Sequence, residues 1–354
     1  MCYNTAMFKP QFSLNFRILN ILSSIERLYG KLQAEKLIPS LSLLLSQENQ
    51  ILATHYSTSI EGNPLSPQDV TNVVLGDQIP TTKSEKEVKN YFEIITKLPD
   101  LVRQKTPITV ELTEKLHKTL MKGIELDSLG KVRNGPVFVG HRTELEIVVK
   151  HNPPYHTADE IKKALTELYD WLSQEKELHP LIKAAIFHHQ FAYIHPFFDG
   201  NGRLGRILTT YFLLREGYEV SKYFVIDDYY DIDRHLYSDV LHSADTGDKT
   251  SWIEYFLEGI ATSLQGALAR IDELKHSHLE RIEGEKRVLV TPREEEVLQI
   301  VISKKAIKTS DIESAFSVTR QQAHALLSSL VSKKLLKKYG STKMSYYKLR
   351  EKRK

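Results

Sequence analysis

The segment HPFFDGNGRLGR, residues 195–206, concentrates side chains that can bind and activate a charged ligand. A Gly-Asn-Gly turn (residues 200–202) precedes a helical run over 204–214. Glycines allow the backbone to turn tightly there, and the N–H groups of a helix start favour an anion. Arg203 and Arg206 are three residues apart, so they project to neighbouring sides of the first turn. Two guanidinium groups at such a helix start favour an oligophosphate over a single carboxylate.

Two further residues of the segment add acid–base and metal chemistry. Asp199 would repel phosphate unless a cation lies between them, and Mg²⁺ binds one or two carboxylates together with phosphate oxygens. His195 is the nearby side chain that can accept a proton near neutral pH. We expect Phe197 and Phe198 to serve packing. Each residue alone has an ordinary explanation, as a satisfied histidine, a solvated charge or a turn, but the combination indicates a nucleotide-transfer site.

The segment resembles, without a gap, the Fic family signature His-x-Phe-x-Asp/Glu-Gly-Asn-Gly-Arg-x-x-Arg, and every defined position matches. The resemblance covers roughly residues 10–265. It implies a helical Fic fold that transfers AMP from ATP to a Tyr, Thr or Ser hydroxyl of a protein, or of the chain itself, and releases pyrophosphate. The implied roles are: His195, base for the hydroxyl; Asp199, ligand of Mg²⁺ or Mn²⁺; Gly200, Asn201 and Gly202, anion hole; Arg203 and Arg206, grip on the outer phosphates; Phe197, loop anchor.

The nucleotide base has a weaker sequence signal. Members of the family often carry a Tyr-Tyr pair that lines the adenine pocket ahead of a Gly-Asp. Here the matching stretch reads Tyr237-Ser238 ahead of Gly247-Asp248, so Tyr237 is the one retained tyrosine. Transfer of UMP, phosphate or phosphocholine, as in some relatives, therefore stays an alternative to transfer of AMP.

A second informative stretch is STSIEGNP, residues 57–64. Gly62 and Pro64 predict a helix end, which puts Glu61 in the last turn, where the helix dipole disfavours an anion. A solvated glutamate is the ordinary explanation. The stretch also resembles the family's inhibitory motif Ser/Thr-x-x-x-Glu-Gly/Asn, with Ser57, Glu61 and Gly62 in the defined positions. The resemblance implies that Glu61 pairs with Arg206 and restrains the enzyme; it leaves removal of AMP open.

A hairpin is predicted before the signature. Two β-rich runs, Val137–Val139 and Leu145–Val149, flank a polar turn and end at a double proline. Together with Arg133 the hairpin resembles the family's flap, which holds the target segment as an added strand. The target-docking residues implied by the resemblance are Val137, Phe138, Val139, Glu146, Ile147 and Val148.

The elements that must position these residues are mostly helices, since most segments before residue 290 have helical periodicity. Adjacent His188 and His189 point to different faces of a helix, which favours core packing over a metal site. We predict a mainly α protein with four parts: 1–105, a helical region carrying the inhibitory motif; 106–267, the catalytic core; 268–290, a linker helix; 291–354, a winged helix-turn-helix.

The predicted winged helix-turn-helix has three short helices, at Glu294–Ile302, around TSDIESAF and at Arg320–Ser332, followed by a two-stranded wing. Residues 304–354 carry a net charge of +11, whereas the whole chain carries +3. DNA binding is therefore predicted slightly ahead of dimerisation or protein docking. The candidate DNA contacts are Arg320, Gln321, Gln322, Lys333, Lys337 and Lys343, with His324, Lys334 and Lys338 nearby.

Composition sets the remaining expectations. The chain has 354 residues, 41% hydrophobic and 26% charged, as in soluble globular proteins. Cys2 is the single cysteine, so an intramolecular disulfide is excluded and a reducing, cytoplasmic setting without a membrane span is expected. The family resemblance also implies a symmetric homodimer. The alternative from another class is a nucleotide-sensing, DNA-binding regulator, which an intact His195 and Asp199 disfavour.

Overall fold

The computed structural model describes residues 8–35, 39–76, 79–124, 129–142, 147–220, 223–283, 292–316, 318–340 and 345–350. The chain divides into two compact units. Unit 1 comprises Met1–Glu35 and Leu45–Arg270, and unit 2 comprises Lys36–Leu44 and Ile271–Lys354. Both are mainly helical, and each contains one small antiparallel sheet, as expected from the sequence. No helix in the described part of the chain is both long and apolar enough to span a membrane.

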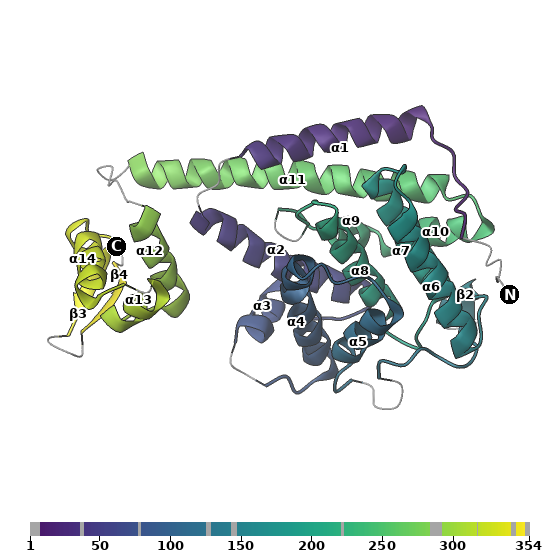
Figure 1. The fold of residues 1–354 in the computed structure, drawn as a ribbon, viewed down its shortest axis with the longest axis horizontal. Helices are drawn as coiled ribbons and strands as arrows, with labels where there is room; N and C mark the ends of the chain where they lie inside the picture. The colour runs from purple at the N-terminus through teal and green to yellow at the C-terminus, as the bar shows by residue number, and fades with distance from the viewer. Residues whose placement is uncertain are drawn as a thin grey trace. The chain divides into compact units, whose positions relative to one another are not determined.

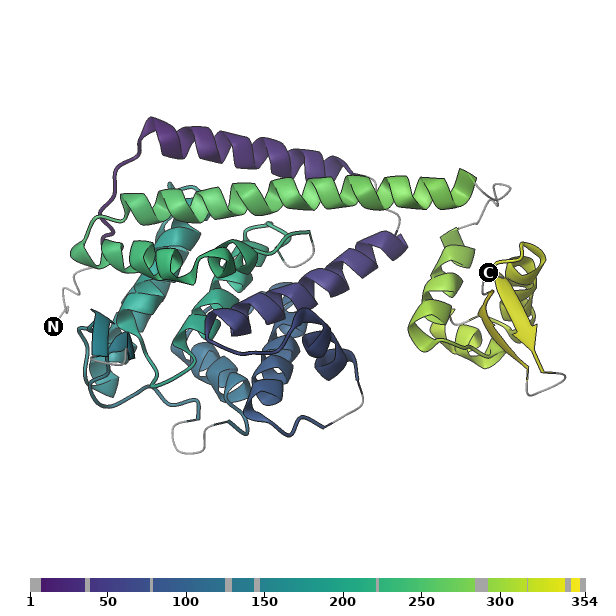
Figure 2. The ribbon, with the colours of Figure 1, turned by 180° about the vertical axis from the view of Figure 1, so that it is seen from behind.

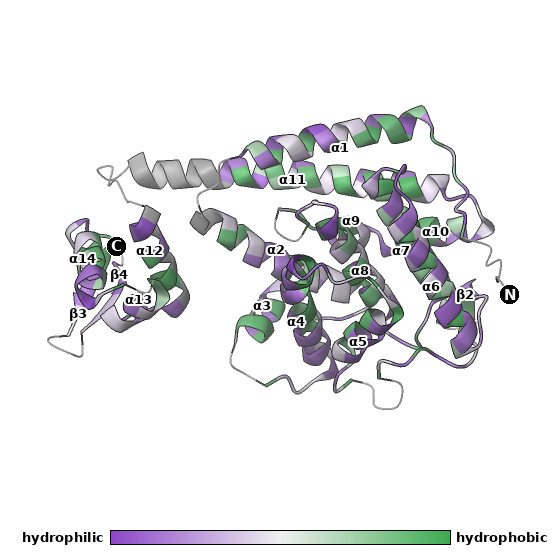
Figure 3. Cartoon of the chain, in the orientation of Figure 1, coloured by the Kyte–Doolittle hydropathy of each residue, from purple (hydrophilic) through white to green (hydrophobic). Residues whose placement is uncertain are grey.

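Unit 1 is built from helices that pack around one another (Figures 1 and 2). They are α1 (Phe16–Ala34), α2 (Pro39–Ile60), α3 (Pro67–Leu75), α4 (Lys83–Arg103), α5 (Val110–Leu120), α6 (Ala158–Gln174), α7 (Pro180–Ile194), α8 (Asn201–Arg215), α9 (Asp227–Ile232), α10 (Arg234–Ser243), the 3₁₀ turn η1 (Ala244–Thr246) and α11 (Thr250–Glu283), of which α2 and α11 continue into unit 2. Green and purple residues interleave along α1 and α6 (Figure 3), as expected for helices with one packed face and one solvated face.

Helices α7 and α8 form the centre of unit 1 and carry the signature segment between them. Helix α7 begins with Pro180 at its first position and is buried along most of its length. The two helices approach closely because Gly205 on α8 faces the ring of Phe191, where an added Cβ would lie 3.2 Å from a ring carbon. This packing fixes the start of α8 relative to the end of α7.

The hairpin is present, but its strands are shifted from the predicted ones. Strand β1 (Val139–Arg142) pairs antiparallel with β2 (Ile147–His151). Val137 and Phe138 precede the strand because Pro136 has no N–H to donate and Arg133 holds the carbonyl of Gly135. Residues 143–146, and with them the predicted contact Glu146, lie outside the described residues.

The linker helix predicted over 268–290 is not a separate element. Helix α11 is one continuous helix of 34 residues that begins at Thr250, and the packed face of its first half gave no break in periodicity to mark a boundary. Residues 284–290 lie outside the described residues. The first turns of α11 lie alongside α1 (Figures 1 and 2), where the side chain of Asn15 donates a hydrogen bond to Glu254.

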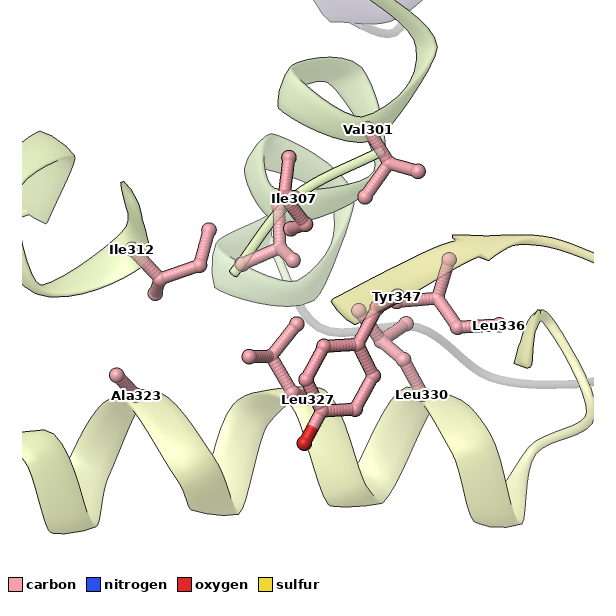
Figure 4. Packing of buried hydrophobic residues seen from close by; sticks show 9 residues of the cluster. Val301, Ile307, Ile312, Ala323, Leu327, Leu330, Leu336 and Tyr347 are labelled. Atoms are coloured by element: carbon pink, nitrogen blue, oxygen red, sulfur yellow. The ribbon is translucent and has the colours of Figure 1, made fainter. Parts of the chain in front are cut away.

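Unit 2 contains the three helices and two strands predicted for the C-terminal region. They are α12 (Pro292–Lys304), α13 (Thr309–Phe316), α14 (Arg320–Ser332), β3 (Leu336–Tyr339) and β4 (Tyr346–Leu349), the strands being antiparallel. Thr319 and Gln322 form a capping box at the start of α14. Side chains from every element meet in one core, in which Leu327 and Leu330 of α14 face Tyr347 of β4 (Figure 4).

Candidate active site

The catalytic candidate His195 is held at the end of α7 by a buried arginine. His195 has a left-handed backbone (φ 50°) and ends the helix. The guanidinium of Arg133 donates from Nε to the His195 carbonyl at 2.7 Å and from Nη2 to the Ile194 carbonyl at 3.3 Å. The Arg133 N–H donates to the carbonyl of Pro196 at 2.9 Å. Arg133 therefore satisfies the last carbonyls of α7 and sets the position of His195.

The turn that follows His195 is held by the side chain of Asn201. The Asn201 side chain accepts from the N–H of Phe197 at 2.9 Å and donates to the Phe197 carbonyl at 2.7 Å. Because these hydrogen bonds engage the side-chain amide, Asn201 can contact a ligand through its backbone. Phe197 is fully buried, as predicted, whereas Phe198 is 49% exposed, which makes its predicted packing role wrong. The backbone turns outward after the Phe197 anchor, which leaves the next side chain at the surface.

His117 is a supporting residue that sequence reasoning missed. Its ring stacks on Phe197 at 3.7 Å between centroids. Its Nδ1 accepts from the N–H of Gly130 at 3.1 Å, so Nε2 carries the proton and donates to the Asp199 carbonyl at 3.0 Å. A lone histidine on the apolar face of α5 has no sequence signal that would distinguish it from an ordinary core residue.

An anion site opens at the start of α8, and a carboxylate lies in it. Gly200 adopts φ 80°, and within the described chain no side chain caps the helix. The carboxylate of Glu61 lies directly against Gly202: a Cβ added there would be 2.2 Å from Glu61 Oε1. A glycine is thus required for the approach, and the group that approaches is an anion at a helix N-terminus.

Arg206 holds the same carboxylate. Its Nη2 donates to Glu61 Oε1 at 2.8 Å and to the Ser57 carbonyl at 2.7 Å, and its Nε donates to Ser57 Oγ at 2.7 Å. Burial lowers the pKa of Arg206, but Glu61 and other nearby acidic groups raise it further than burial lowers it, so the guanidinium is charged. Glu61 lies one residue beyond the end of α2 rather than in its last turn, because Gly62 (φ 86°) ends the helix.

Arg203 is engaged by a different pair of carboxylates. Its Nη1 lies 3.0 Å from Glu87 Oε1 on α4, and its Nη2 lies 3.1 Å from Asp199 Oδ1. The Arg203 side chain is buried, whereas that of Asp199 is 47% exposed. Asp199 Oδ1 also accepts from the N–H of Gly200 at 2.5 Å, which leaves the exposed carboxylate its Oδ2 for a ligand.

The surroundings of His195 disfavour its charged form. Burial, together with the nearby His151 and Arg133, lowers the pKa of His195 to about 4. The ring is therefore neutral near pH 7 and able to accept a proton.

Tyr237, the candidate for the nucleotide-base pocket, is buried rather than exposed in the candidate active site. Its hydroxyl lies 2.9 Å from His188 Nε2, and its ring stacks on Tyr230 at 4.4 Å. Burial raises the pKa of Tyr237 to about 12, so the hydroxyl is neutral. His188 packs among aromatic rings, whereas buried His189 donates to Asp245, so the two histidines have different environments, as their adjacency predicted.

The hairpin presents its residues beside this site. Phe138 and Val149 are about half exposed, and Val137, Val139 and Val148 are partly buried. For Ile147 the backbone alone is described. The sheet has two strands in the described part of the chain, so each strand has an edge that an extended peptide could pair with.

The candidate DNA contacts lie in unit 2. Arg320, Gln321 and Gln322 are exposed on the first turn of α14, and Lys337 is exposed on β3. Lys333 is paired with the buried carboxylate of Glu294 at 2.6 Å. Lys343 lies outside the described residues.

Comparison with known proteins identifies the central region. Residues 107–213 match the Fic/DOC family model. Protein adenylyltransferase Fic of Nematostella vectensis is 29% identical over 221 residues, which cover 61% of this chain and 48% of that protein. Protein adenylyltransferase fic-1 of Caenorhabditis elegans is 25% identical over 228 residues, covering 62% of this chain and 42% of that protein. The chain thus spans about half the length, or less, of these relatives.

Solved structures show the same fold. A crystal structure of a Fic family protein from Desulfovibrio desulfuricans G20 aligns with a TM-score of 0.65 at 25% identity and covers 98% of this chain and 100% of that chain. Fic-1 from Caenorhabditis elegans aligns with a TM-score of 0.60 at 21% identity over 72% of this chain and 73% of that chain. Residues 107–213 therefore match the Fic/DOC family model within a mainly helical fold that these solved structures share.

Proposed function

We propose that the chain transfers AMP from ATP to a hydroxyl group of a protein and that Glu61 restrains this activity. The observation that carries the proposal is the Glu61 carboxylate, which lies against Gly202 and on Arg206 where the helix start offers its N–H groups. A site that binds this anion has the charge and backbone donors that a phosphate needs. The names of the curated relatives supply the transferred group.

In the proposed reaction, His195 accepts the proton of the attacking hydroxyl. The hydroxyl oxygen bonds to the α-phosphorus, the bond from that phosphorus to the bridging oxygen breaks, and pyrophosphate leaves. The N–H groups at the start of α8 and the guanidinium of Arg206 stabilise the charge on the phosphates. The neutral ring of His195, held by Arg133, is ready for this role without losing a proton first.

Asp199 fits the role of a Mg²⁺ or Mn²⁺ ligand because its exposed carboxylate keeps Oδ2 free of the contacts that hold Oδ1. When bound, the ion would neutralise phosphate charge. Arg203 is already paired with Glu87 and also contacts Asp199 Oδ1. It would therefore orient the Asp199 carboxylate more than it would bind phosphate.

The restraint follows from competition for Arg206. While Glu61 holds Nη2, that guanidinium is not free for the outer phosphates, and the carboxylate itself repels them. Loss of Glu61 would leave Arg206 on Ser57, with its charge available.

The experiment compares Glu61→Gly with Glu61→Gly/His195→Ala, incubated with Mg²⁺, cell lysate and ATP labelled at the α- or the γ-phosphate. We expect α-label on protein, no γ-label, and loss of label with His195→Ala. Retained γ-label would show phosphate transfer instead. Parallel reactions with labelled GTP, CTP and UTP test the choice of base that Ser238 leaves open.

We further propose that residues 291–354 of unit 2 form a winged helix-turn-helix that binds DNA. It is supported by the exposed polar side chains at the start of α14 and by the net charge of +11 over residues 304–354. Fluorescence anisotropy with labelled duplex DNA at 50 and 200 mM salt tests it. Salt-sensitive binding that Arg320→Ala/Gln321→Ala weakens is expected, and absence of binding at low salt would contradict it. Light scattering tests the homodimer that the family resemblance implies. The single cysteine of the chain supports the proposal that the protein works in a reducing cytoplasm.

A further inference from the structure

A cluster of two histidines and an aspartate lies next to the active site and takes no part in the proposed transfer. His151 ends strand β2, His242 lies in the last turn of α10, and Asp245 lies in η1. Strand β2 packs beside α10 (Figure 1). His151 Nδ1 is 2.7 Å and His242 Nδ1 is 3.1 Å from the same carboxylate oxygen, Asp245 Oδ2. All three atoms lie within 4.8 Å of one another.

The hydrogen bond on the far side of His151 fixes what its Nδ1 offers. Nε2 of His151 lies 2.9 Å from the carbonyl of Tyr193, which can only accept, so Nε2 carries the proton. Nδ1 of His151 then faces a carboxylate oxygen 2.7 Å away. Either a proton on Nδ1 or a bound metal ion would satisfy both atoms. Metal-binding histidines commonly donate their other N–H to a carbonyl in this way.

The second oxygen of Asp245, Oδ1, accepts a hydrogen bond from His189, whose ring nitrogens are both engaged in hydrogen bonds. Lys249 Nζ lies 2.9 Å from His189 Nδ1 and donates to it, so His189 Nε2 donates to Asp245 Oδ1 at 2.9 Å. Asp245 is thereby oriented with Oδ2 toward His151 and His242, and the Lys249 charge is kept on the Oδ1 side.

We propose that His151, His242 and Asp245 bind a divalent zinc-type metal ion through His151 Nδ1, His242 Nδ1 and Asp245 Oδ2, with water in a fourth position. Two imidazoles and one carboxylate suit Zn²⁺, whereas Mg²⁺ and Ca²⁺ prefer oxygen ligands. Bonds of roughly 2.0–2.2 Å need the donors slightly further apart than His151 and Asp245 are here. The rings of His151 and His242 are within 14° of parallel and could separate by a small shift of β2.

The ion would join β2 to α10 and η1, which follow each other directly but are distant from β2 in sequence. It would fasten the end of β2, and with it the hairpin, to α10 and η1 beside the carbonyl of Tyr193. Its effect on target docking rests on the proposed function, but metal binding itself does not, and it involves neither Asp199 nor ATP.

Zinc binding is tested on the full-length protein without nucleotide, by competition with a chromophoric chelator. The matched variants are His242→Gln, which removes a ligand, and His235→Gln, an exposed histidine on the same helix. We expect wild type and His235→Gln to share a tight site that His242→Gln weakens by about 100-fold or more. Equal zinc affinity in all three proteins, or no tight site in wild type, would overturn the proposal and leave a proton between His151 and Asp245.

A structural readout separates this site from surface histidines. Zn²⁺ should raise the melting temperature of wild type and His235→Gln but not of His242→Gln. It should also slow hydrogen exchange at the amides of residues 147–151. Because no readout uses AMP transfer, failure of the metal site and failure of the proposed activity are distinguishable.

Discussion

Arg203 and Arg206 lie on one turn of α8, and both are buried against a glutamate, yet their surroundings differ. Glu87, the ion-pair partner of Arg203, has a side chain only 12% exposed; its Oε2 accepts from Asn63 Nδ2 at 2.9 Å, and its Oε1 also lies 3.9 Å from the exposed Lys83 Nζ. Glu61, the partner of Arg206, is 35% exposed and lies in a turn after a helix end. One pair is enclosed by the fold, and the other faces an opening.

The difference separates a structural ion pair from an exchangeable one. Removing one partner of an enclosed pair leaves a buried charge, which costs several kcal/mol. Under the proposed function a phosphate would replace the carboxylate at Arg206, so the guanidinium would not be left unpaired. The region around Glu87 should therefore govern stability, and the region around Glu61 should govern activity.

The largest expected effect is at His195, because the rate increase expected from Glu61→Gly can be observed only while the base is present. In a Glu61→Gly background, His195→Ala should lower the rate of label transfer by about 10²–10⁴-fold, because the base is lost. The exposed His156 supplies the control, and His156→Ala should leave the rate unchanged. A rate above one tenth of the parent in His195→Ala would assign the base elsewhere.

The next effect concerns stability. Arg203→Gln should lower the free energy of unfolding by about 3 kcal/mol, because Glu87 keeps its charge inside the fold. The exposed pair of Arg103 and Asp100 is the control, and Arg103→Gln should cost about 0.5 kcal/mol or less. Urea unfolding measures both. Similar losses for the two variants would remove the distinction drawn for the enclosed pair.

Acid should destabilise the packing between α7 and α8, because His188 on α7 contacts Thr209 on α8. Burial, with Arg206 and His189 nearby, lowers the pKa of His188 to about 3, so the folded protein keeps this ring neutral. The unfolded chain protonates it near pH 6.5, so its contribution is present above that pH and is lost as the pH falls toward 3, by up to about 1.4 kcal/mol per pH unit. Urea midpoints at pH 7.5 and 5 should differ less in His188→Gln. An identical difference would show that His188 does not contribute.

The smallest effect is at Ser57. Ser57→Ala removes the hydrogen bond to Arg206 Nε and leaves the bond to Glu61 in place. A net bond of about 0.5–1.5 kcal/mol predicts a two- to tenfold rise in label transfer as Arg206 is held less firmly in its restrained position. Ser59→Ala, whose hydroxyl contacts Arg234 instead, is the control and should have wild-type activity. A fall in transfer with Ser57→Ala would mean that Ser57 positions Arg206 for phosphate.

Sequence reasoning succeeded where the determinants are local. The glycine turn, the helix start after it and the buried Phe197 depend on neighbours a few residues apart. It failed where backbone direction decides, as at Phe198, and where a proline keeps Val137 out of the strand.

Residues assembled from distant segments had no sequence signal. His117 contacts Asp199 from a helix 82 residues away, and Glu87 reaches Arg203 from α4. The cluster at His151 brings together a strand end and a distant pair, His242 and Asp245, and the three-residue spacing of that pair alone does not predict the contact with His151. The contact between Glu61 and Arg206 was implied by family resemblance alone, because spacing cannot bring residues 145 positions apart together.

The most direct test of the account is the initial rate of α-label transfer to one target protein by wild type, Glu61→Gly and Glu87→Gln at equal folded concentration. Exchange of a charged hydrogen bond of about 1.5–3 kcal/mol predicts a rise of about 10- to 100-fold for Glu61→Gly and none for Glu87→Gln. Equal rates in wild type and Glu61→Gly, or the same rise in both variants, would contradict the claim that the Glu61 carboxylate occupies the phosphate site.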